Sequence, residues 1–453
     1  MLISRFFAIF AAATAFAVAA DAEQIGFGPN PKLPPPESSW LPTINVARAK
    51  GWPDGVKPQP APGLDVTPFA TGLDHPRWLH VLPNGDVLVA EASAPEHPPS
   101  APESDRGWTM GYYLSGIRNW IIAYYLRKAG ARVKSANRII LLRPKPNGAA
   151  EMHVFLEGLN SPFGMALVGD ALYVANTDAL LKFPYKEGDL KITAAPKKVA
   201  DLPAGPINFH WTRNILATKD GARLFVAVGS NSNVPEKGVE NEESRAAILE
   251  VDAESGATRV FASGLRNPVG MALEPSSNEL FAVVNEREGY GDDLVPDYLT
   301  SVKGGAFYGW PYSYFGQHVD VAVTPQRPDM VAKAIAPDYA LGGHTASLGL
   351  AFGPASALPE RYGSGAFIGQ HGSWNRRQPS GYKVIFVPFA DGKPNGQPLD
   401  VLTGFLDHKG NALGRPVGVE VAKDGALLVA DDVGNAIWRV TGSQRASSTS
   451  TVH

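Results

Sequence analysis

A single phrase recurs six times along the chain, and this repetition limits what the sequence can fold into more than any other feature. Each copy has a polar start, a short apolar strand, a turn that contains Gly or Asn, and a second apolar strand. The copies begin at Gly72, Gly158, His210, Gly264, His344 and Gly414. Self-similarity of this kind is typical of repeat architectures, in which each unit buries its apolar faces against its neighbours.

A further short strand follows most copies, in segments such as RIILLRPKPNG from Arg138, AAILEVDAESG from Ala246 and GYKVIFVPFADG from Gly381. Each repeat is therefore expected to form a small antiparallel sheet. Small sheets without long helices between them bury both faces only when they pack around a common axis. The pattern predicts an all-β fold, a six-bladed β-propeller over residues 65–441, in preference to an array of β-sandwiches.

The segments outside the repeats indicate an exported protein. Residues 1–22 have the basic, apolar and small-residue regions of a signal peptide. A proline-rich composition predicts an extended N-terminal strap over residues 23–64, and residues 442–453 are expected to be a disordered tail. The chain has no cysteine, which excludes disulfides and thiolate metal sites within it. We expect a periplasmic or secreted protein that is stabilised by its core.

An insertion over residues 94–136 interrupts the first blade and is expected to be helical. Arg118 and Asn119 break its apolar run, so it should not span a bilayer. Residues 108–134 then have two interpretations: a helix packed on the propeller, which we favour, or a peripheral contact with a membrane or an electron-acceptor protein. The net charge of −3 gives no electrostatic basis for binding nucleic acid.

Polar residues gather at the repeat starts, where loops enter the inner strands of a propeller and converge on one mouth of its channel. They include His75, Arg77, Asn160, His210, Arg213, Arg266, Asn267, His344 and Arg415. The strand ends and turns add Asn285, Glu286, Arg287, Asp292, Asp293, Arg376, Arg377, Asp431 and Asp432. Guanidinium groups suit a polyanionic ligand and oxygen donors suit a hard metal ion. Taken singly, each residue also has a structural explanation, such as closing a turn or pairing with a neighbouring charge.

Several longer motifs give these residues a context. GLRNPVGMAL from Gly264, followed by VVNEREGYGDDLVPDYLTSVKGGAFYGWPYSY from Val283, resembles the quinoprotein glucose and sorbosone dehydrogenase family. FHWTRNILATKDGARLFVAVGS, GQHGSWNRRQPSGYKVIFVPF and GRPVGVEVAKDGALLVADDVGNAIWRV extend the resemblance over nearly the whole mature chain. The insertion and the GQHGSWNR phrase are more similar to sorbosone dehydrogenases than to soluble glucose dehydrogenases. The resemblance implies pyrroloquinoline quinone and Ca²⁺ as cofactors and a sugar or sugar-derived aldehyde as substrate.

The resemblance also implies a role for particular residues. His210 matches the catalytic histidine, a general base for the substrate hydroxyl while hydride passes to the quinone. Arg266 matches a residue that is both catalytic and cofactor-binding. The further cofactor-binding positions are Asn267, Arg415, Asp431 and, in place of a lysine in the fifth blade, Arg376 or Arg377. Asn160, Ser230 and His344 are expected to face the substrate, and backbone carbonyls around Glu286 and Arg287 to bind Ca²⁺.

Two departures from the family pattern bear on the substrate. Ser230 stands where the family often has an aspartate behind the catalytic histidine, and Asn160 and Asn285 stand where glucose dehydrogenases tend to have glutamine. Glucose is therefore disfavoured, and the electron acceptor, whether a quinone, a cytochrome or a dye, is left open. The alternatives are a Ca²⁺-dependent lactonase-type hydrolase and a non-catalytic propeller that binds glycans or proteins. No GxGxxG motif joins a strand to a helix, which disfavours nicotinamide and flavin cofactors.

Overall fold

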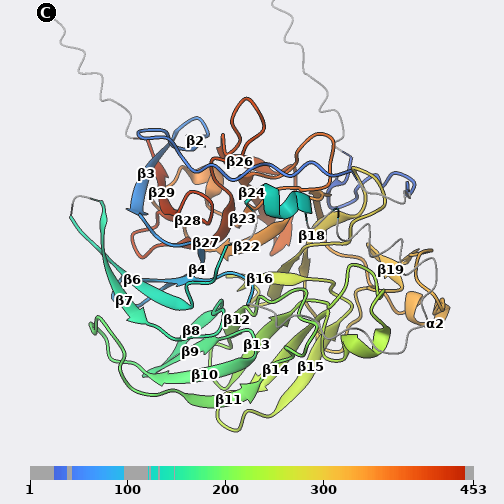
Figure 1. The fold of residues 1–453 in the computed structure, drawn as a ribbon, viewed down its shortest axis with the longest axis horizontal. Helices are drawn as coiled ribbons and strands as arrows, with labels where there is room; N and C mark the ends of the chain where they lie inside the picture. Colours follow the sequence, from blue (N-terminus) through green and yellow to red (C-terminus); the bar gives the residue numbers. More distant parts are fainter. Residues whose placement is uncertain are drawn as a thin grey trace, which may run out of the picture.

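The structure is a computed structural model, which describes residues 25–37, 43–95, 121, 124–130, 133–146 and 148–443. Six antiparallel sheets are arranged around a centre to which each contributes its innermost strand (Figure 1). Each sheet has a core of four strands that follow one another outward from that centre. The prediction of an all-β, six-bladed propeller is confirmed.

Within each blade, the first strand named is the innermost and the others follow it outward. The first blade holds β4 (Pro76–Val81), β5 (Val87–Glu91), β6 (Arg138–Pro144) and β7 (Ala150–Leu156). The second holds β8 (Met165–Val168), β9 (Ala171–Ala175), β10 (Ala179–Pro184) and β11 (Lys197–Asp201). The third holds β12 (Ile215–Ala217), β13 (Arg223–Val228), β14 (Ala247–Asp252) and β15 (Thr258–Ser263). The fourth blade holds β16 (Pro268–Leu273), β17 (Leu280–Val284), β18 (Pro296–Ser301) and β21 (Tyr339–Gly343). The fifth holds β22 (Ser347–Phe352), β23 (Gly365–Gln370), β24 (Lys383–Ala390) and β26 (Leu399–Thr403). The sixth holds β27 (Pro416–Val421), β28 (Leu427–Asp431), β29 (Ala436–Gly442) and β3 (Leu64–Thr71).

The ring closes in the sixth blade, where strands from both ends of the chain pair. β3, the first long strand, is the outermost strand of a sheet whose other three strands come from the end of the chain. Because β3 pairs along its whole length with β29, the two ends are held by backbone hydrogen bonds. The inner strands β27 and β4 then lie side by side and complete the circle.

The second strand of each blade explains why the sheets pack face to face. β5, β9, β17 and β28 are buried at every position, and their sequences are VLVAE, ALYVA, LFAVV and LLVAD. Neighbouring blades cover both faces of such a strand, so apolar side chains are needed on both sides. One core cluster joins the fifth and sixth blades through Phe386, Val401, Leu427 and Trp438. Each fully buried side chain of this size contributes about 1.5–3 kcal/mol.

The described part of the N-terminal segment is extended and crosses several blades. β1 (Phe27–Gly28) pairs with β21, and β2 (Gln59–Pro60) pairs with β26. Between them, the Trp52 ring packs edge-on against Phe405 and Trp438, with ring centroids 5.5 Å apart in both pairs. The strap is thus fastened to the outer edges of the fourth and fifth blades and to the core of the sixth.

The remaining elements are short and lie in connections between the strands. They are β19 (Ser313–Tyr314), β20 (His318–Val319), α2 (Pro328–Val331), β25 (Lys393–Pro394) and the 3-10 helices η1 (Val239–Glu242) and η2 (Glu360–Tyr362). Within the insertion, residues 124–128 are helical, and the carbonyl of Ala129 accepts a hydrogen bond from the strap at Ala49. In the described ranges, no helix is both long and apolar enough to cross a bilayer. The signal peptide at 1–22, most of 94–136 and the tail after 443 lie outside the described residues.

Candidate active site

The pairing of the inner strands brings the predicted polar residues to one side of the propeller. Pro268 of β16 lies opposite Val284 of β17, and Pro416 of β27 lies opposite Asp431 of β28. Residues that precede each innermost strand therefore lie beside residues that follow its neighbour. Because all six blades have this pairing, the repeat starts and second-strand ends form one mouth.

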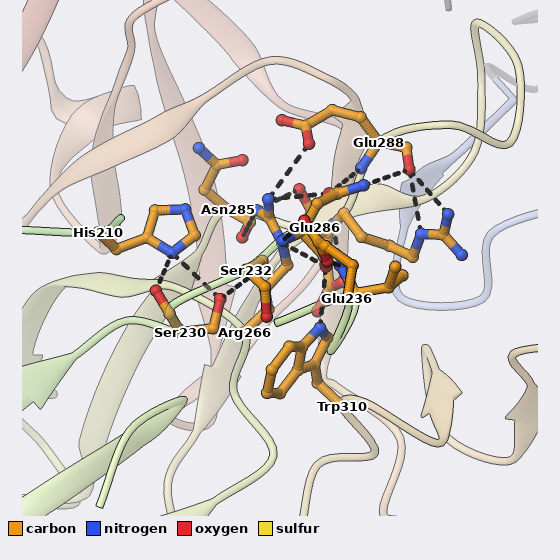
Figure 2. A network of polar contacts seen from close by, with 12 residues as sticks. His210, Ser230, Ser232, Glu236, Arg266, Asn285, Glu286, Glu288 and Trp310 are labelled. Carbon is orange, nitrogen blue, oxygen red and sulfur yellow. Dashed lines mark hydrogen bonds and ion pairs between the residues drawn. The ribbon is translucent and has the colours of Figure 1, made fainter. Parts of the chain in front are cut away.

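His210 lies at this mouth with one ring nitrogen held and the other free for chemistry. Its Nδ1 is 2.8 Å from the carbonyl oxygen of Ser230 and 3.1 Å from the Ser230 hydroxyl, as Figure 2 shows. A carbonyl only accepts hydrogen bonds, and the Ser230 hydroxyl donates its own hydrogen to the carbonyl of Ser232. The proton of a neutral His210 imidazole must therefore sit on Nδ1, which leaves the lone pair of Nε2 available as a base.

The surroundings of His210 favour its uncharged form. Burial lowers its pKa well below the usual value, and the positive charges of Arg266, Arg245 and Arg213 lower it further. The hydrogen bond to Ser230 opposes this shift. An imidazole in this setting is neutral at pH 7 and so can accept a proton.

Arg266 lies beside His210 but is largely committed to neighbouring groups (Figure 2). It is 1% exposed, and its Nη1 donates to the backbone carbonyls of Asn285 at 3.1 Å and Glu286 at 2.8 Å. Its Nη2 donates to the Asn233 side chain and lies 3.2 Å from a carboxylate oxygen of Glu288. Arg266 thus links the third and fourth blades beneath the mouth.

This arrangement does not fit the calcium site expected at the same carbonyls. Asn285 and Glu286 direct their carbonyl oxygens at a guanidinium, so a divalent cation bound there would lie next to a like charge. Arg287, the other expected contributor, has its side chain paired with Asp320 at 2.6 Å. Among the described residues, no three His, Asp or Glu side chains come together as a metal site. In the described structure the carbonyls of Asn285 and Glu286 thus accept hydrogen bonds from Arg266, and calcium binding by the backbone of Glu286 and Arg287 stays a prediction.

Asn267 is packed against His210 with an unsatisfied amide oxygen. Its Oδ1 is buried and has no hydrogen-bond partner in the described structure. Gly229 explains the close approach, because a Cβ at this position would lie 2.2 Å from Asn267 Oδ1 and 2.5 Å from His210 Cβ. No pattern in the sequence marks Gly229. A glycine is required at this position only because His210 and Asn267, from the start of the fourth blade, lie so close to it in the folded protein.

Arg415 and Asp431 form a unit in the sixth blade. Asp431 Oδ1 accepts from the backbone N–H groups of Arg415 and Gly434, both at 2.8 Å. Its Oδ2 accepts from the indoles of Trp52 at 2.7 Å and Trp438 at 3.0 Å. With both oxygens occupied, Asp431 positions Arg415 and the strap, and its own contact with a cofactor stays a prediction. The Arg415 guanidinium donates to the Ala47 carbonyl of the strap at 3.1 Å, lies 5.2 Å from the Tyr382 ring and makes no ion pair within the described structure.

The other predicted residues are less free than expected. Arg376 pairs with Asp293, and Arg377 pairs with Asp292 at 3.1 Å, so the two arginines tie the fifth blade to the acidic loop of the fourth. His344 Nε2 lies 2.8 Å from the carbonyl of Gly291 in that loop. Asn160 is half-buried at the start of the second blade, where its carbonyl accepts from Thr177 N–H. Their contacts with cofactor or substrate stay predictions.

A second polar cluster at the mouth contains a histidine that sequence reasoning missed. Asp432 is 2% exposed, and its Oδ2 contacts Arg77 and lies 2.8 Å from His371 Nε2 and 3.5 Å from His75 Nε2. These groups come from the sixth, first and fifth blades. In the sequence, His371 lies in the GQHGSWNR motif. This motif indicates the family but does not show which of its residues faces the mouth.

Buried polar atoms without partners are concentrated on this side of the molecule. Most of those in the described structure belong to residues at or near the start of an inner strand or the end of a second strand: Arg77, Ser161, Asn176, Arg213, Asn231, Asn267, Gln370 and Asp432. Buried polar groups in a folded protein are normally satisfied, so an accumulation of this kind indicates a polar ligand. Donors and acceptors are mixed, and the uncommitted charge of Arg415 is positive.

Comparison with known proteins identifies the family. The family model described as TrAA12-like matches residues 146–295 and 316–443, which together are more than half of the chain. The chain belongs to the TrAA12-like family. The expected kinship with quinoprotein sugar dehydrogenases is thereby confirmed.

Individual relatives agree with membership of the TrAA12-like family. A pyrroloquinoline quinone-dependent pyranose dehydrogenase of Coprinopsis cinerea is 24% identical over 439 residues, which cover 83% of this chain and 54% of that one. The chain thus spans about half the length of that curated relative. The holo pyrroloquinoline quinone domain of the Coprinopsis cinerea pyranose dehydrogenase has a TM-score of 0.66 at 20% identity, covering 87% of this chain and 100% of the domain. A Trichoderma reesei structure of the carbohydrate-active family AA12 has a TM-score of 0.65 at 18% identity, and the match covers 89% of this chain and 99% of the Trichoderma reesei chain. At these identities, the structures show the fold alone.

Proposed function

We propose that this protein is a quinoprotein oxidoreductase that uses pyrroloquinoline quinone to oxidise a sugar or a sugar-derived aldehyde, with sorbosone and aldoses as the first candidates. The single observation that carries the proposal is His210, whose Nε2 is left free at a mouth rich in guanidinium groups. Membership of the TrAA12-like family supports the cofactor, because the relatives in that family are named for it.

The donor set at the mouth suits a cofactor with three carboxylates. Arg415 is 7% exposed and forms no ion pair in the described residues, and the Asn267 amide oxygen, which is unpaired there, can accept a hydrogen bond from a cofactor N–H group. We propose these two residues as direct contacts, with Arg266 and Arg376 or Arg377 contributing positive potential from within their ion pairs. When bound, pyrroloquinoline quinone supplies the carbonyl carbon that accepts hydride.

His210 is proposed to act as the general base. Its Nε2 takes the proton of the substrate hydroxyl, while the N–H on Nδ1 stays bound to Ser230 and fixes the ring. Asn160, Ser230 and His344 are proposed as the substrate side of the site. Because Ser230 donates its hydrogen to Ser232, its contribution is to orient His210.

A lactonase-type hydrolase would need several carboxylate and amide side chains around one metal ion. The described residues contain no such group of ligands. The unpaired buried guanidinium groups favour a polyanionic ligand, which also argues against a binding propeller for neutral glycans. Calcium is left to experiment, because the carbonyls expected to bind it accept hydrogen bonds from Arg266.

The setting of the reaction follows from the sequence features. The signal-like residues 1–22 support a periplasmic or secreted enzyme. Its electron acceptor is proposed to be a quinone or a cytochrome outside this chain, for which an artificial dye can substitute. A peripheral contact through residues 108–134 is one route by which such an acceptor could dock.

The test is dye-linked oxidation by the purified mature protein with and without pyrroloquinoline quinone and Ca²⁺, on a panel of aldoses, sorbosone and simple aldehydes. Quinone-dependent turnover of one sugar class supports the proposal, and the panel names the substrate. If the quinone neither changes the absorbance of the mixture nor supports turnover, the proposal fails. Lactone hydrolysis would then be measured on the same preparation.

A further inference from the structure

The loop that carries His210 is held from behind by two buried arginines. Arg213 is 0% exposed and Arg245 is 5% exposed. Arg213 Nη1 and Arg245 Nη2 each donate to the backbone carbonyl of His210, both at 2.8 Å. One peptide oxygen therefore receives two charged donors, which fixes the backbone from which the imidazole projects.

The same two arginines share their other acceptors as well. Both donate to the carbonyl of Pro203 and to the side-chain oxygen of Asn208. The Asn208 amide in turn donates to the Thr177 hydroxyl at 2.8 Å. Residues 203–210 are thus folded around a pair of guanidinium groups and fastened to the second blade.

This pair of cations is unusual because no carboxylate is bonded to it. In the described residues, neither Arg213 nor Arg245 forms an ion pair, and Glu242, the carboxylate with the largest influence on Arg245, is occupied by Asn231 N–H and the Ser232 hydroxyl. Asp178 acts on Arg213 and Glu242 on Arg245 only through space, and two like charges buried without a bonded counter-ion are costly to maintain. A structural role alone would be met by neutral hydrogen-bond donors.

The backbone around Arg245 is also strained. Ser244 and Ala246, on either side of it, have φ angles of 55° and 47°, in the left-handed region that non-glycine residues rarely adopt. A residue held in this region persists only when its surroundings impose it, a situation concentrated at functional sites. The strain aims the Arg245 side chain at the His210 loop.

We infer that Arg245, together with Arg213, is a positioning residue that holds the His210 loop and keeps its imidazole uncharged, in place of the carboxylate that supports a histidine base elsewhere. A carboxylate behind an imidazole stabilises the protonated ring. Two guanidinium groups do the opposite, so a proton accepted at Nε2 is passed on readily. The inference rests on the proposed function for its catalytic meaning, but its physical content concerns only residues of this chain.

The charged groups around His210 from all neighbouring elements are consistent with this inference. Arg266 approaches from the start of β16, Arg245 from the connection before β14 and Arg213 from the connection before β12, and all three lower the pKa of His210. Of these three, only Arg266 forms an ion pair in the described structure, with Glu288, whereas Glu242 and Asp178 act on Arg245 and Arg213 through space without bonding to them. At the rim, Lys237 lies over the Phe209 ring, which is itself edge-on to His210. Burial and, after it, these three guanidinium charges therefore lower the pKa of His210, against the hydrogen bond to Ser230.

This arrangement predicts a base that works in mildly acidic surroundings. An unperturbed histidine loses its basic form as the pH falls below about 6.5, and a histidine supported by a carboxylate loses it at a higher pH. His210 should remain unprotonated, and the enzyme active, at a pH where such a histidine is already charged. That property suits an enzyme whose reaction acidifies its surroundings, because oxidation of an aldehyde hydrate releases a carboxylic acid.

The experiment is a titration of His210 in cofactor-free protein, followed by NMR of ring-labelled histidine and assigned with His210→Gln. We expect the wild-type signal to titrate below the usual midpoint. Arg245→Met should raise the proton affinity of His210 about threefold to tenfold, because it removes one nearby charge. The acidic limb of kcat/KM should move upward by the same amount in the loaded enzyme.

Two further variants keep the inference falsifiable. Arg245→Lys retains the charge and should keep the low midpoint, while lowering kcat because a single ammonium cannot bridge the same acceptors. Arg259→Met, which removes an exposed arginine far from the mouth, should change nothing. A folded Arg245→Met protein whose His210 midpoint equals that of wild type overturns the inference. Absence of quinone-dependent activity with the shift intact would instead reject only the proposed function.

Discussion

The imidazole of His210 is supported by the backbone carbonyl of Ser230, 2.8 Å from its Nδ1, and not by a carboxylate. A carbonyl fixes the tautomer as well as a carboxylate does, but it contributes much less to stabilising a protonated ring. The orientation of the base and its proton affinity are therefore set separately in this protein. Orientation comes from Ser230 and Gly229, and the lowered proton affinity comes first from burial and then from the surrounding arginines.

Ser230→Asp tests this separation directly. A carboxylate at this position should raise the pKa of His210, by on the order of one to two units, because it stabilises the imidazolium. The acidic limb of the pH profile of kcat/KM should then move upward. Ser230→Ala is the matched control, since it removes the hydroxyl without adding charge and keeps the carbonyl contact. An unchanged limb in Ser230→Asp would mean that another group controls the profile.

His210→Gln should lower kcat by about 10²–10⁴-fold, the usual contribution of a general base. Quinone binding, measured by absorbance titration, should be preserved, because the proposed contacts are Asn267 and Arg415. His318→Gln is the control, as His318 lies on the exposed β20 hairpin. If His210→Gln retains full activity, the base must be sought elsewhere, with His371 beside Asp432 as the first alternative.

Much of the fold could be predicted because the repeats are local. Several inner and second strands are joined by a tight turn such as Asn84-Gly85 or Asp424-Gly425, so pattern and turn chemistry point to the same hairpins. The position of His210 at the mouth followed from the same regularity. These features depend on residues that are close in sequence.

The partners of the predicted site residues could not be predicted, because these partners lie far away in the sequence. Arg376 pairs with Asp293, 83 residues earlier, and Arg77 pairs with Asp432, 355 residues later. Whether an arginine faces a ligand or a carboxylate depends on the loop of a neighbouring blade. The guanidinium of Arg266 at the carbonyls of Asn285 and Glu286 is the clearest case, because no pattern in the sequence marks a main-chain acceptor.

Gly229→Ala should disturb the site more than the fold. A Cβ at this position would lie 2.5 Å from His210 Cβ, so the loop must move, at a cost of about 1–3 kcal/mol. We expect kcat/KM to fall at least tenfold while circular dichroism stays unchanged. Gly205→Ala, whose added Cβ meets nothing within 4 Å, is the control. Equal effects of the two substitutions on kcat/KM would contradict the packing argument.

Asp431→Ala should act through the strap and Arg415. It leaves two indole N–H groups and two backbone N–H groups without their acceptor, and each unsatisfied buried donor costs about 1–3 kcal/mol. The melting temperature should fall by several degrees and quinone affinity should weaken. Asp400→Ala, which removes an exposed carboxylate from an ion pair with Lys383, should change neither. Normal quinone affinity in a destabilised Asp431→Ala protein would separate Arg415 from cofactor binding.

The buried carboxyl group of Glu286 should make the folded protein less stable as the pH rises, whereas most acidic residues have the opposite effect. Burial raises its pKa to about 7, whereas an unfolded chain has a value of about 4.3. Between these values the folded protein holds a proton that the unfolded chain has lost, so the free energy of unfolding decreases as the pH rises through this window. Glu286→Gln, which mimics the protonated form, should be more stable than wild type at pH 8, by on the order of 1–3 kcal/mol, and equally stable at pH 4.

The measurement is urea denaturation of cofactor-free protein at both pH values. Glu157→Gln is the control, because Glu157 is exposed and its pKa is lowered by Lys191, so it should show no gain at pH 8. A Glu286→Gln protein that is destabilised equally at both pH values would show that the hydrogen bond from Arg287 N–H to the Glu286 carboxylate outweighs the burial of its charge. The loop that carries the carbonyl acceptors of Arg266 would then depend on an ionised Glu286.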